Sequence, residues 1–483
     1  MLFNSLHFLL FFPFTLLIFF LLSPKHRWLF LLLASCYFYM AYRPAFILIL
    51  LGIIAIDYIG GLLIERSSGV AKKLYLGLSL ASNLGLLFFF KYANFALENF
   101  ARLAGVIGAP SHFSPLDIVL PVGLSFHTFQ ALSYTIEVYR GNQKAERHLG
   151  IYALYVLYWP QLVAGPIERP QNILHQLHSP RSFTWDSFRV GSHLVLWGFF
   201  KKLVIADRLG IFVKNVYDAP ESAPGFACLL ATYFFAIQIY CDFSGYSDIA
   251  RGSAAMMGVD LMRNFRTPYL SPSLPEFWRR WHISLSSWFR DYVYVPLGGK
   301  QSRFWATFAT FFLSGLWHGA SWTFVAWGLF HGTLVYLFGL SAGIRRTISQ
   351  SLGLDRIPKV SRAISIFVTF NVVCFGWVLF RAVDLQNAFT IWTRMVTFNA
   401  WNAASVVQSY DARLFGLQGP ELVLVLLCIA LMLLVEALHP MRWRGSTALR
   451  LPRPIHAAAF YCFAILVIIL GKYTNQQFIY FQF

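Results

Sequence analysis

The sequence predicts an all-α protein that crosses a membrane many times. Of its 483 residues, 57% are hydrophobic and only 12% are charged, whereas about 25% of the residues of an ordinary soluble domain carry a charge. A soluble core cannot bury so many apolar side chains, but lipid can cover them. Apolar runs long enough, or nearly long enough, to span a bilayer recur along the chain and indicate roughly 11 to 13 transmembrane or re-entrant helices.

The predicted helices follow one another with short polar turns between them. We expect one membrane-embedded domain over residues 1–483, with N-terminal helices in residues 1–116, a central core in about 117–335 and C-terminal helices in 336–483. Several runs are shorter than the roughly 17 residues that span a bilayer, so some helices are expected to be tilted or re-entrant. The runs are residues 6–22, 28–42, 45–64, 74–90, 117–136, 150–164, 191–205, 225–239, 304–317, 322–340, 363–380, 422–435 and 457–470.

The excess of positive charge indicates an orientation in the membrane rather than a nucleic-acid partner. The chain has 39 Lys and Arg against 21 Asp and Glu, a net charge of +18, and these charges lie in short loops between apolar runs. Basic turns at residues 24–27 and 65–73 are expected on the cytoplasmic side, which places the N-terminus outside. No nucleic-acid binding is expected.

The apolar run FFLSGLWHGASWTFVAWGLFHG, residues 311–332, carries two histidines, His318 and His331. A titratable side chain at membrane depth is costly, so it is by default a functional candidate, and histidine exchanges protons near neutral pH. On a helix, Gly315 and Trp322 would share the face of His318, where a small residue lets another group approach and Trp can wall a cavity. The alternative is a structural histidine bonded to a backbone carbonyl.

The segment 251–303 has no apolar run of spanning length, but it has helical periodicity. Apolar residues recur at intervals of three and four and predict an amphipathic helix, whose opposite face carries Arg279, Arg280 and Ser287. His282, at the border of the apolar stripe, either lines an entry to the site or is an interfacial histidine beside basic residues. The apolar positions are Leu274, Phe277, Trp278, Trp281, Leu285 and Trp288.

Two carboxylates, Asp242 and Asp248, follow an apolar run in the segment QIYCDFSGYSD, which begins at Gln238. The small residues Ser244 and Gly245 could break the helix there and turn backbone groups into a cavity. Paired carboxylates suggest a cation site or a proton path. The alternative, slightly favoured, is that they bond local amides and basic neighbours to hold a turn.

Two further segments, LPVGLSFHTFQ and YWPQLVAGPI, place Pro and Gly inside apolar runs, which marks kinked or discontinuous helices. Their polar residues His127, Gln130 and Gln161 are either pocket donors or interhelical hydrogen-bonding groups, and we favour the second role. The chain has no GxSxG, Walker or GxGxxG motif, so covalent serine catalysis and ATP hydrolysis have no support. No metal and no tightly bound cofactor are expected.

Taken together, five blocks of sequence resemble the membrane-bound O-acyltransferase (MBOAT) superfamily, and in particular its branch that acetylates bacterial polysaccharides. They occur in the order found in that superfamily and span about residues 117–335. The blocks are PVGLSFHTFQ, WPQLVAGPI, QIYCDFSGYSDIA, FWRRWHISLSSWFRDYVYVPLGG and SGLWHGASWTFVAWGLFHG.

The resemblance implies a ring of helices around a tunnel through the membrane, with His318 as catalytic histidine and His282 as the second histidine of the family. It also implies acetyl-CoA as donor substrate, with His318 as general base. Arg279 and Arg280 would attract the CoA phosphates, unless they are only topology signals. The residues expected along the tunnel are Trp317, Trp322, Gln238, Asp242, Ser244, Arg279 and Arg280.

The function expected from this resemblance is that of a multi-pass O-acetyltransferase of the bacterial inner membrane. It would move acetyl groups from cytoplasmic acetyl-CoA across the membrane for O-acetylation of an exported polysaccharide such as alginate, with a periplasmic acetyltransferase subunit as partner and lipid around it. The same chemistry on peptidoglycan or cellulose stays open. So does a transporter of a polymer precursor or small solute, with Asp242 and Asp248 as ion ligands, or a scaffold for a secretion complex whose histidines are structural.

Overall fold

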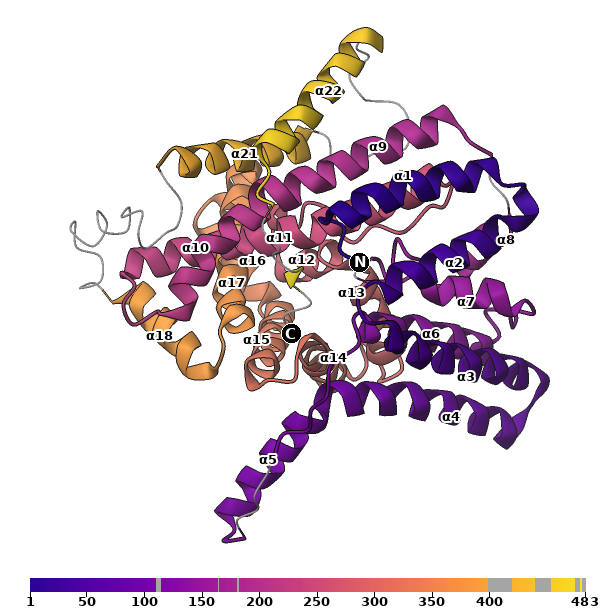
Figure 1. Cartoon of the computed structure of the whole chain (residues 1–483). Helices are drawn as coiled ribbons and strands as arrows, with labels where there is room; N and C mark the ends of the chain where they lie inside the picture. The colour runs from indigo at the N-terminus through magenta and orange to yellow at the C-terminus, as the bar shows by residue number, and fades with distance from the viewer. Residues whose placement is uncertain are drawn as a thin grey trace. The chain divides into compact units, whose positions relative to one another are not determined.

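The computed structural model describes residues 1–109, 114–163, 165–179, 182–397, 419–438, 453–473 and 478–479. Within these residues the chain forms helices and connecting segments without a β-strand (Figure 1), which confirms the all-α prediction. Ala164, the end of one predicted run, lies outside the described residues. The ring around a tunnel and the single domain stay predictions.

Six helical segments of the described chain are long and apolar enough to cross a membrane, and two shorter apolar helices accompany them. The prediction of a multi-pass membrane protein is therefore confirmed. Two of the shorter predicted runs, residues 225–239 and 422–435, lie within longer spanning segments. The run 304–317 coincides with the 16-residue helix Arg303–His318, as expected for a tilted or re-entrant element. The six segments are Pro44–Arg66, Gly69–Val106, Gly225–Met256, Trp322–Leu340, Pro358–Arg381 and Gly419–Leu438, and the shorter helices are Leu6–Leu21 and Pro454–Leu470.

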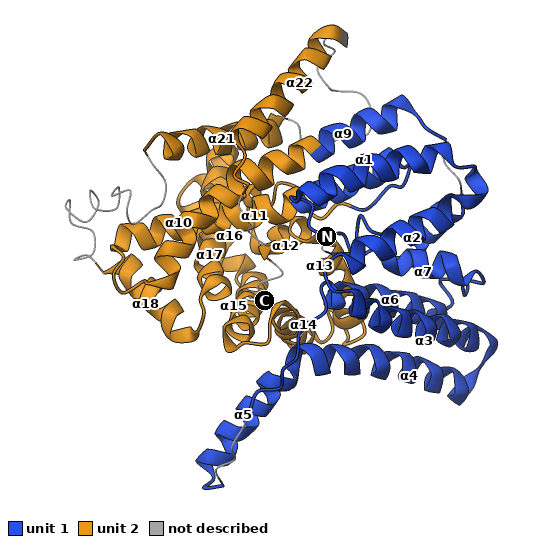
Figure 2. Cartoon of the chain, viewed as in Figure 1, with its two compact units in different colours: residues 1–195, 246–262 blue, residues 196–245, 263–483 orange. Residues whose placement is uncertain are grey.

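The chain groups into two compact units, residues 1–195 with 246–262 and residues 196–245 with 263–483 (Figure 2). In unit 1, α3, α4 and α6 pack on one another and α2 packs on α7. Buried polar groups join its helices: Asp57 on α3 accepts hydrogen bonds from Ser79 Oγ (2.6 Å) and Asn83 Nδ2 on α4. The helices of this unit are α1 (Leu6–Leu21), α2 (Arg27–Met40), α3 (Ile47–Arg66), α4 (Gly69–Leu87), α5 (Ala93–Val106), α6 (Leu124–Arg140), α7 (Leu149–Leu157) and α8 (Pro170–His178). Two short 3-10 turns, η1 (Pro24–His26) and η2 (Pro44–Phe46), connect some of them, and the π-helical stretch η3 (Phe88–Tyr92) joins α4 to α5.

Unit 2 carries the histidine-bearing segments, and its most extensive helix pair is α14 with α15. α9 (Trp185–Phe199) and α11 (Gly225–Met256) contribute residues to both units. The other elements of unit 2 are η4 (Phe200–Ala206), α10 (Asp207–Asp218), η5 (Pro268–Leu270), α12 (Leu274–Arg280), α13 (Ile283–Phe289), η6 (Arg290–Tyr294), α14 (Arg303–His318), α15 (Trp322–Leu340), α16 (Ala342–Ser351), η7 (Leu354–Arg356), α17 (Pro358–Arg381), α18 (Leu385–Val396), α21 (Gly419–Leu438) and α22 (Arg453–Leu470).

The predicted amphipathic helix of residues 274–288 is in fact two short helices. α12 begins where the Ser273 hydroxyl accepts a hydrogen bond from Glu276 N (3.3 Å), with a proline in the first turn. The helix ends because Trp281 is extended and His282 is left-handed (φ 42°, ψ 56°). α13 then restarts, so the prediction of one continuous helix was wrong at His282.

The expected break at Ser244 and Gly245 does not occur either, because α11 runs unbroken from Gly225 to Met256. Within unit 2, Gly245 instead provides a close contact: a Cβ there would lie 2.8 Å from Gly198 O and 3.3 Å from Lys201 Cβ. The small residue thus lets α11 pack against the backbone of a neighbouring helix, as small residues do in membrane bundles.

Candidate active site

A cavity of about 370 Å³ in unit 2 brings the two predicted catalytic histidines together. His282 and His318 are buried, at 1% and 4% exposure, whereas Arg279 and Arg290 on the same lining are exposed. The cavity therefore extends from the accessible surface into the core of the unit. Its polar lining consists of Arg279, His282, Ser286, Ser287, Arg290, Tyr294, Thr310, Ser314 and His318, with Trp278 and Trp281 among the apolar residues.

Asn264 fixes the turn that carries His282. Its backbone carbonyl accepts from Ile283 N (2.9 Å), and its side-chain Oδ1 accepts from the hydroxyl of Ser284 (2.6 Å). A left-handed conformation at a residue with a Cβ is costly and persists only where its surroundings hold it. Asn264 supplies that support, so the direction of the imidazole is set by a residue 18 positions upstream.

Aromatic rings surround the imidazole of His282. The Phe243 ring lies 4.5 Å from it, edge to face, and the Trp317 ring lies 5.8 Å from it. Burial lowers the pKa of His282 well below its ordinary value, because a low-dielectric environment disfavours the charged form. This imidazole is therefore neutral at pH 7.

His318 is the last residue of α14, and a glycine contact with α15 holds this end of the helix. A Cβ on Gly315 would lie 2.2 Å from Phe324 O, a backbone atom of α15, so only glycine permits this approach. The rings of Trp327 and Phe380 each lie 5.1 Å from the imidazole, edge to face. His318 is thus oriented by close helix packing and an apolar wall.

This arrangement suits proton transfer to or from a bound polar group. Two imidazoles face one cavity, and Trp317 contacts both rings, at 5.8 Å from His282 and 5.0 Å from His318. The exposed guanidinium groups of Arg279 and Arg290 can bind an anionic part of a substrate, since Arg matches phosphate geometry, although Arg290 also pairs with its neighbour Asp291 (2.7 Å). No covalent nucleophile is needed for such chemistry.

The predicted tunnel residues separate into those at the cavity and those away from it. Arg279 lines the cavity. Trp317 is outside the lining but contacts the rings of both His282 and His318. Arg280 forms an ion pair with Glu276 instead, and Trp322 is 50% exposed at the start of α15, outside the cavity lining.

Asp242 and Ser244 belong to a different, buried cluster. Lys202 Nζ lies 2.6 Å from Asp242 Oδ1 and 2.8 Å from Asp207 Oδ1, and Asp242 Oδ2 accepts from Ile479 N (2.8 Å). We call Lys202, Asp207 and Asp242 the buried ion network. Ser244 accepts from Lys201 Nζ (2.9 Å), so a structural role fits both residues.

The remaining predicted candidates lie outside the cavity lining. Asp248 pairs with Arg251 (3.6 Å) in unit 1, and Gln238 is half-buried on α11. His331 is fully buried between the rings of Trp278 (5.0 Å) and Trp327 (5.1 Å). Its ring nitrogens have no hydrogen-bond partner among the described residues.

The favoured role, an interhelical hydrogen bond, is confirmed for Gln130 and His127, whereas Gln161 lies in the turn after α7 and bonds back to that helix. Gln130 and Gln161 both donate to the carbonyl of Tyr155, the latter at 2.8 Å. His127 bonds the backbone of Val156. These contacts tie α6 to α7 and tie the following turn back to α7, within unit 1.

Sequence reasoning missed Asn264 and Arg290. Nothing in the local pattern marks Asn264, because its role depends on a left-handed turn at His282. Arg290 had a signal: it lies eleven residues after Arg279, a spacing that returns to the same face of a continuous helix. The break at His282 changes that geometry, yet both side chains line the cavity.

Comparison with known proteins identifies the family. Residues 148–379 match the sequence profile of the membrane-bound O-acyltransferase family, MBOAT. The chain belongs to this family and is a membrane O-acyltransferase.

Its similar relatives include bacterial acetylation proteins. The chain is 39% identical to "Probable alginate O-acetylase AlgI" of Pseudomonas aeruginosa, over 89% of this chain and 81% of that protein. It is 38% identical to the protein of the same name from Azotobacter vinelandii (89% and 84%). The "Peptidoglycan O-acetyltransferase" of Helicobacter pylori is 32% identical over 78% of this chain and 75% of that protein. The predicted resemblance is therefore confirmed.

Proposed function

We propose that this protein is an inner-membrane O-acetyltransferase that moves acetyl groups from cytoplasmic acetyl-CoA toward the hydroxyl groups of an exported polysaccharide. The observation that carries the proposal is the cavity that His282 and His318 share. The acceptor class rests on the similar relatives named as alginate O-acetylases, which match over most of the chain. A periplasmic acetyltransferase subunit would complete the transfer to the polymer.

In the proposed reaction, His318 acts as general base. It takes the proton of the attacking hydroxyl as the oxygen bonds to the thioester carbonyl carbon. The carbon–sulfur bond then breaks, and the CoA thiolate recovers a proton from the imidazolium, which leaves an acetyl ester and free CoA. His282, neutral at pH 7, orients the donor or the base, and Arg279 and Arg290 hold the CoA phosphates.

Purified protein incubated with acetyl-CoA labelled in its acetyl group tests the assignment, with a hydroxyl acceptor supplied. We expect His318→Gln to slow acetyl transfer by about 10²–10⁴-fold, the usual contribution of a general base. His127→Gln is the matched control, because His127 is equally buried, at 1% exposure, but lies in unit 1. It should keep the wild-type rate.

Transfer at the wild-type rate by a folded His318→Gln protein would refute the proposed base. A transporter would instead carry solute into proteoliposomes without consuming thioester. Two observations favour an enzyme over a transporter. The chain belongs to an acyltransferase family, and Asp242, the proposed ion ligand of a transporter, already forms an ion pair with Lys202. A strain that lacks this protein distinguishes peptidoglycan from an exported polysaccharide as the acceptor. The polymer that is the acceptor should lose its acetyl groups in that strain.

A further inference from the structure

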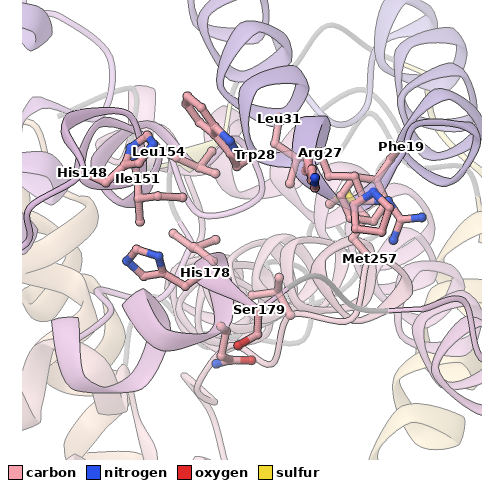
Figure 3. A pocket seen from close by; sticks show the side chains of 15 residues that line it. Phe19, Arg27, Trp28, Leu31, His148, Ile151, Leu154, His178, Ser179 and Met257 are labelled. Carbon is pink, nitrogen blue, oxygen red and sulfur yellow. The ribbon is translucent and has the colours of Figure 1, made fainter.

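Unit 1 contains a second cavity of about 370 Å³, which the proposed acetyl transfer does not use. Its walls come from the end of α1, the start of α2, the start of α7 and the ends of α8 and α11. Figure 3 shows His148, Ile151 and Leu154 on one side of the opening and Phe19 and Arg27 on the other. Four chain segments that are separate in the sequence, within residues 19–31, 148–154, 176–179 and 257–259, therefore meet at this place.

One edge of this cavity is cationic. Lys25 and Arg27 line it, and the Arg27 guanidinium is held in place because its Nε donates to Leu22 O (3.1 Å). The acidic residue nearby, Glu146, is engaged by His178, at 2.7 Å from Nε2. The Glu146 carboxylate is therefore paired with the His178 imidazole. The positive charges of Lys25 and Arg27 then make this edge of the cavity attractive to an anion.

Much of the remaining lining is apolar, although His148, Gln176, His178 and Ser179 also contribute to it, and the helix beside it exposes apolar side chains. Leu31, Ile151, Leu154, Leu177 and Met257 line the cavity. α1, which leads into it, exposes a row of large apolar side chains along its length, as a helix does where lipid covers it. They include Leu10 (67%), Phe14 (63%), Leu17 (59%) and Leu21 (75%). The cationic edge thus lies where a lipid-covered helix ends in a basic turn.

We propose that this cavity binds the headgroup of an anionic phospholipid. The phosphate would contact Lys25 and Arg27, and the glycerol backbone and first acyl carbons would lie along Leu31 and Ile151. Basic pockets between membrane helices are suited to such headgroups. A soluble phosphate compound would satisfy the cations but would leave the apolar wall without a partner, which is why the lipid is the better fit.

The test measures lipid-dependent thermal stabilisation of the purified full-length protein in detergent micelles. A ligand that binds only the folded state raises the melting temperature by an amount that grows with its concentration relative to its dissociation constant. The probes are phosphatidylglycerol, phosphatidylcholine and sn-glycerol 3-phosphate. We expect stabilisation by phosphatidylglycerol alone.

Three variants locate the effect. Lys25→Glu reverses an exposed charge at the cavity and should weaken the apparent affinity for phosphatidylglycerol roughly tenfold. Ser179→Trp, on the lining of the cavity (Figure 3), should weaken it by occupying space without changing charge. Lys73→Glu makes the same charge change at an exposed position near the start of α4 in unit 1 and should behave as wild type.

The proposal is overturned if phosphatidylcholine stabilises the protein equally, or if Lys73→Glu weakens binding as much as Lys25→Glu does. Stabilisation by sn-glycerol 3-phosphate to the same extent would identify a site for soluble phosphate compounds and would also overturn the lipid assignment. Because the readout is melting temperature, the result does not depend on acetyl transfer.

Discussion

At His282, a single residue combines backbone strain with a candidate chemical role. The left-handed conformation costs roughly 1–3 kcal/mol, and the hydrogen bonds from residues 283–284 to Asn264 compensate for it. A histidine placed in an unstrained helix at the same point would project in another direction. The strained backbone conformation of His282 therefore directs its imidazole into the cavity.

We predict that Asn264→Ala lowers both stability and activity. Loss of the side-chain acceptor leaves the buried Ser284 hydroxyl without this bond and should reduce the free energy of unfolding by about 1–3 kcal/mol. The looser turn should also slow acetyl transfer by at least roughly tenfold, because small misplacements are costly in catalysis. Thermal melting and the labelled-donor assay measure the two effects.

Asn172→Ala serves as the control, since Asn172 also donates a side-chain hydrogen bond, to the buried Glu168 in unit 1. It should lower stability and leave the rate per folded molecule unchanged. A wild-type rate for Asn264→Ala, measured well below its melting temperature, would show that the turn does not position His282 for catalysis.

Glu168 gives unit 1 a pH-dependent stability. Its carboxylate is buried and accepts from Met262 N (2.6 Å), and burial raises its pKa from 4.5 to about 7. The unfolded chain ionises near pH 4.5, so this residue's contribution is fully present below that pH and is lost as the pH rises to 7.

We therefore expect Glu168→Gln to change the pH profile of stability. Between pH 4.5 and 8, the wild type should lose on the order of 3 kcal/mol relative to the variant. Chemical unfolding across that range measures the difference. Parallel profiles for the two proteins would mean that the carboxyl group titrates alike in the folded and unfolded states.

At the scale of elements, the α14–α15 pair illustrates how glycine sets the distance between helices. Gly315 contacts the backbone of α15, and a Cβ on Gly328 would lie 2.3 Å from Phe311 O on α14. Backbone atoms cannot move aside as the end of a flexible side chain can. His318 lies one turn beyond Gly315, so the helix spacing also determines its position.

We predict that Gly315→Ala destabilises the protein by about 1–3 kcal/mol, as overpacking does, and slows acetyl transfer. Gly52→Ala on α3 is the matched control, because nothing lies within 4 Å of its Cβ position. That change should be neutral or should stabilise the helix by about 0.5–1 kcal/mol. Equal melting temperatures for the two variants would contradict the proposed helix contact.

At the scale of the molecule, the sequence predicts those features that depend on composition and local pattern. Membrane helices follow from runs of apolar residues, and the motif around His318 lies on the predicted helix. The break at His282 was missed because Asn264, which stabilises it, lies 18 residues away. The bond between Asp242 and Ile479 spans 237 residues, and no local pattern reports such a partner.

That long-range bond connects the end of the chain to the surroundings of His282. Ile479 N donates to Asp242 in the buried ion network, and the ring of Phe478 lies 5.6 Å from that of Phe243. Phe243 in turn packs on His282. The described part of the C-terminal segment is therefore in a position to support both the ion network and the wall of the active site.

We predict that a chain ending at Tyr473 is less stable and transfers acetyl groups at least roughly tenfold more slowly, because Asp242 loses a buried hydrogen bond to a charged group. Phe478→Ala separates the two contributions: it removes the ring beside Phe243 but keeps the backbone donor of Ile479. It should reduce the rate and, because the Phe478 ring is buried, lower the free energy of unfolding by about 3–5 kcal/mol while the hydrogen bond to Asp242 is kept. Melting curves and the labelled-donor assay compare the three proteins. If the truncated protein melts and reacts like the wild type, the chain terminus supports neither the network nor His282.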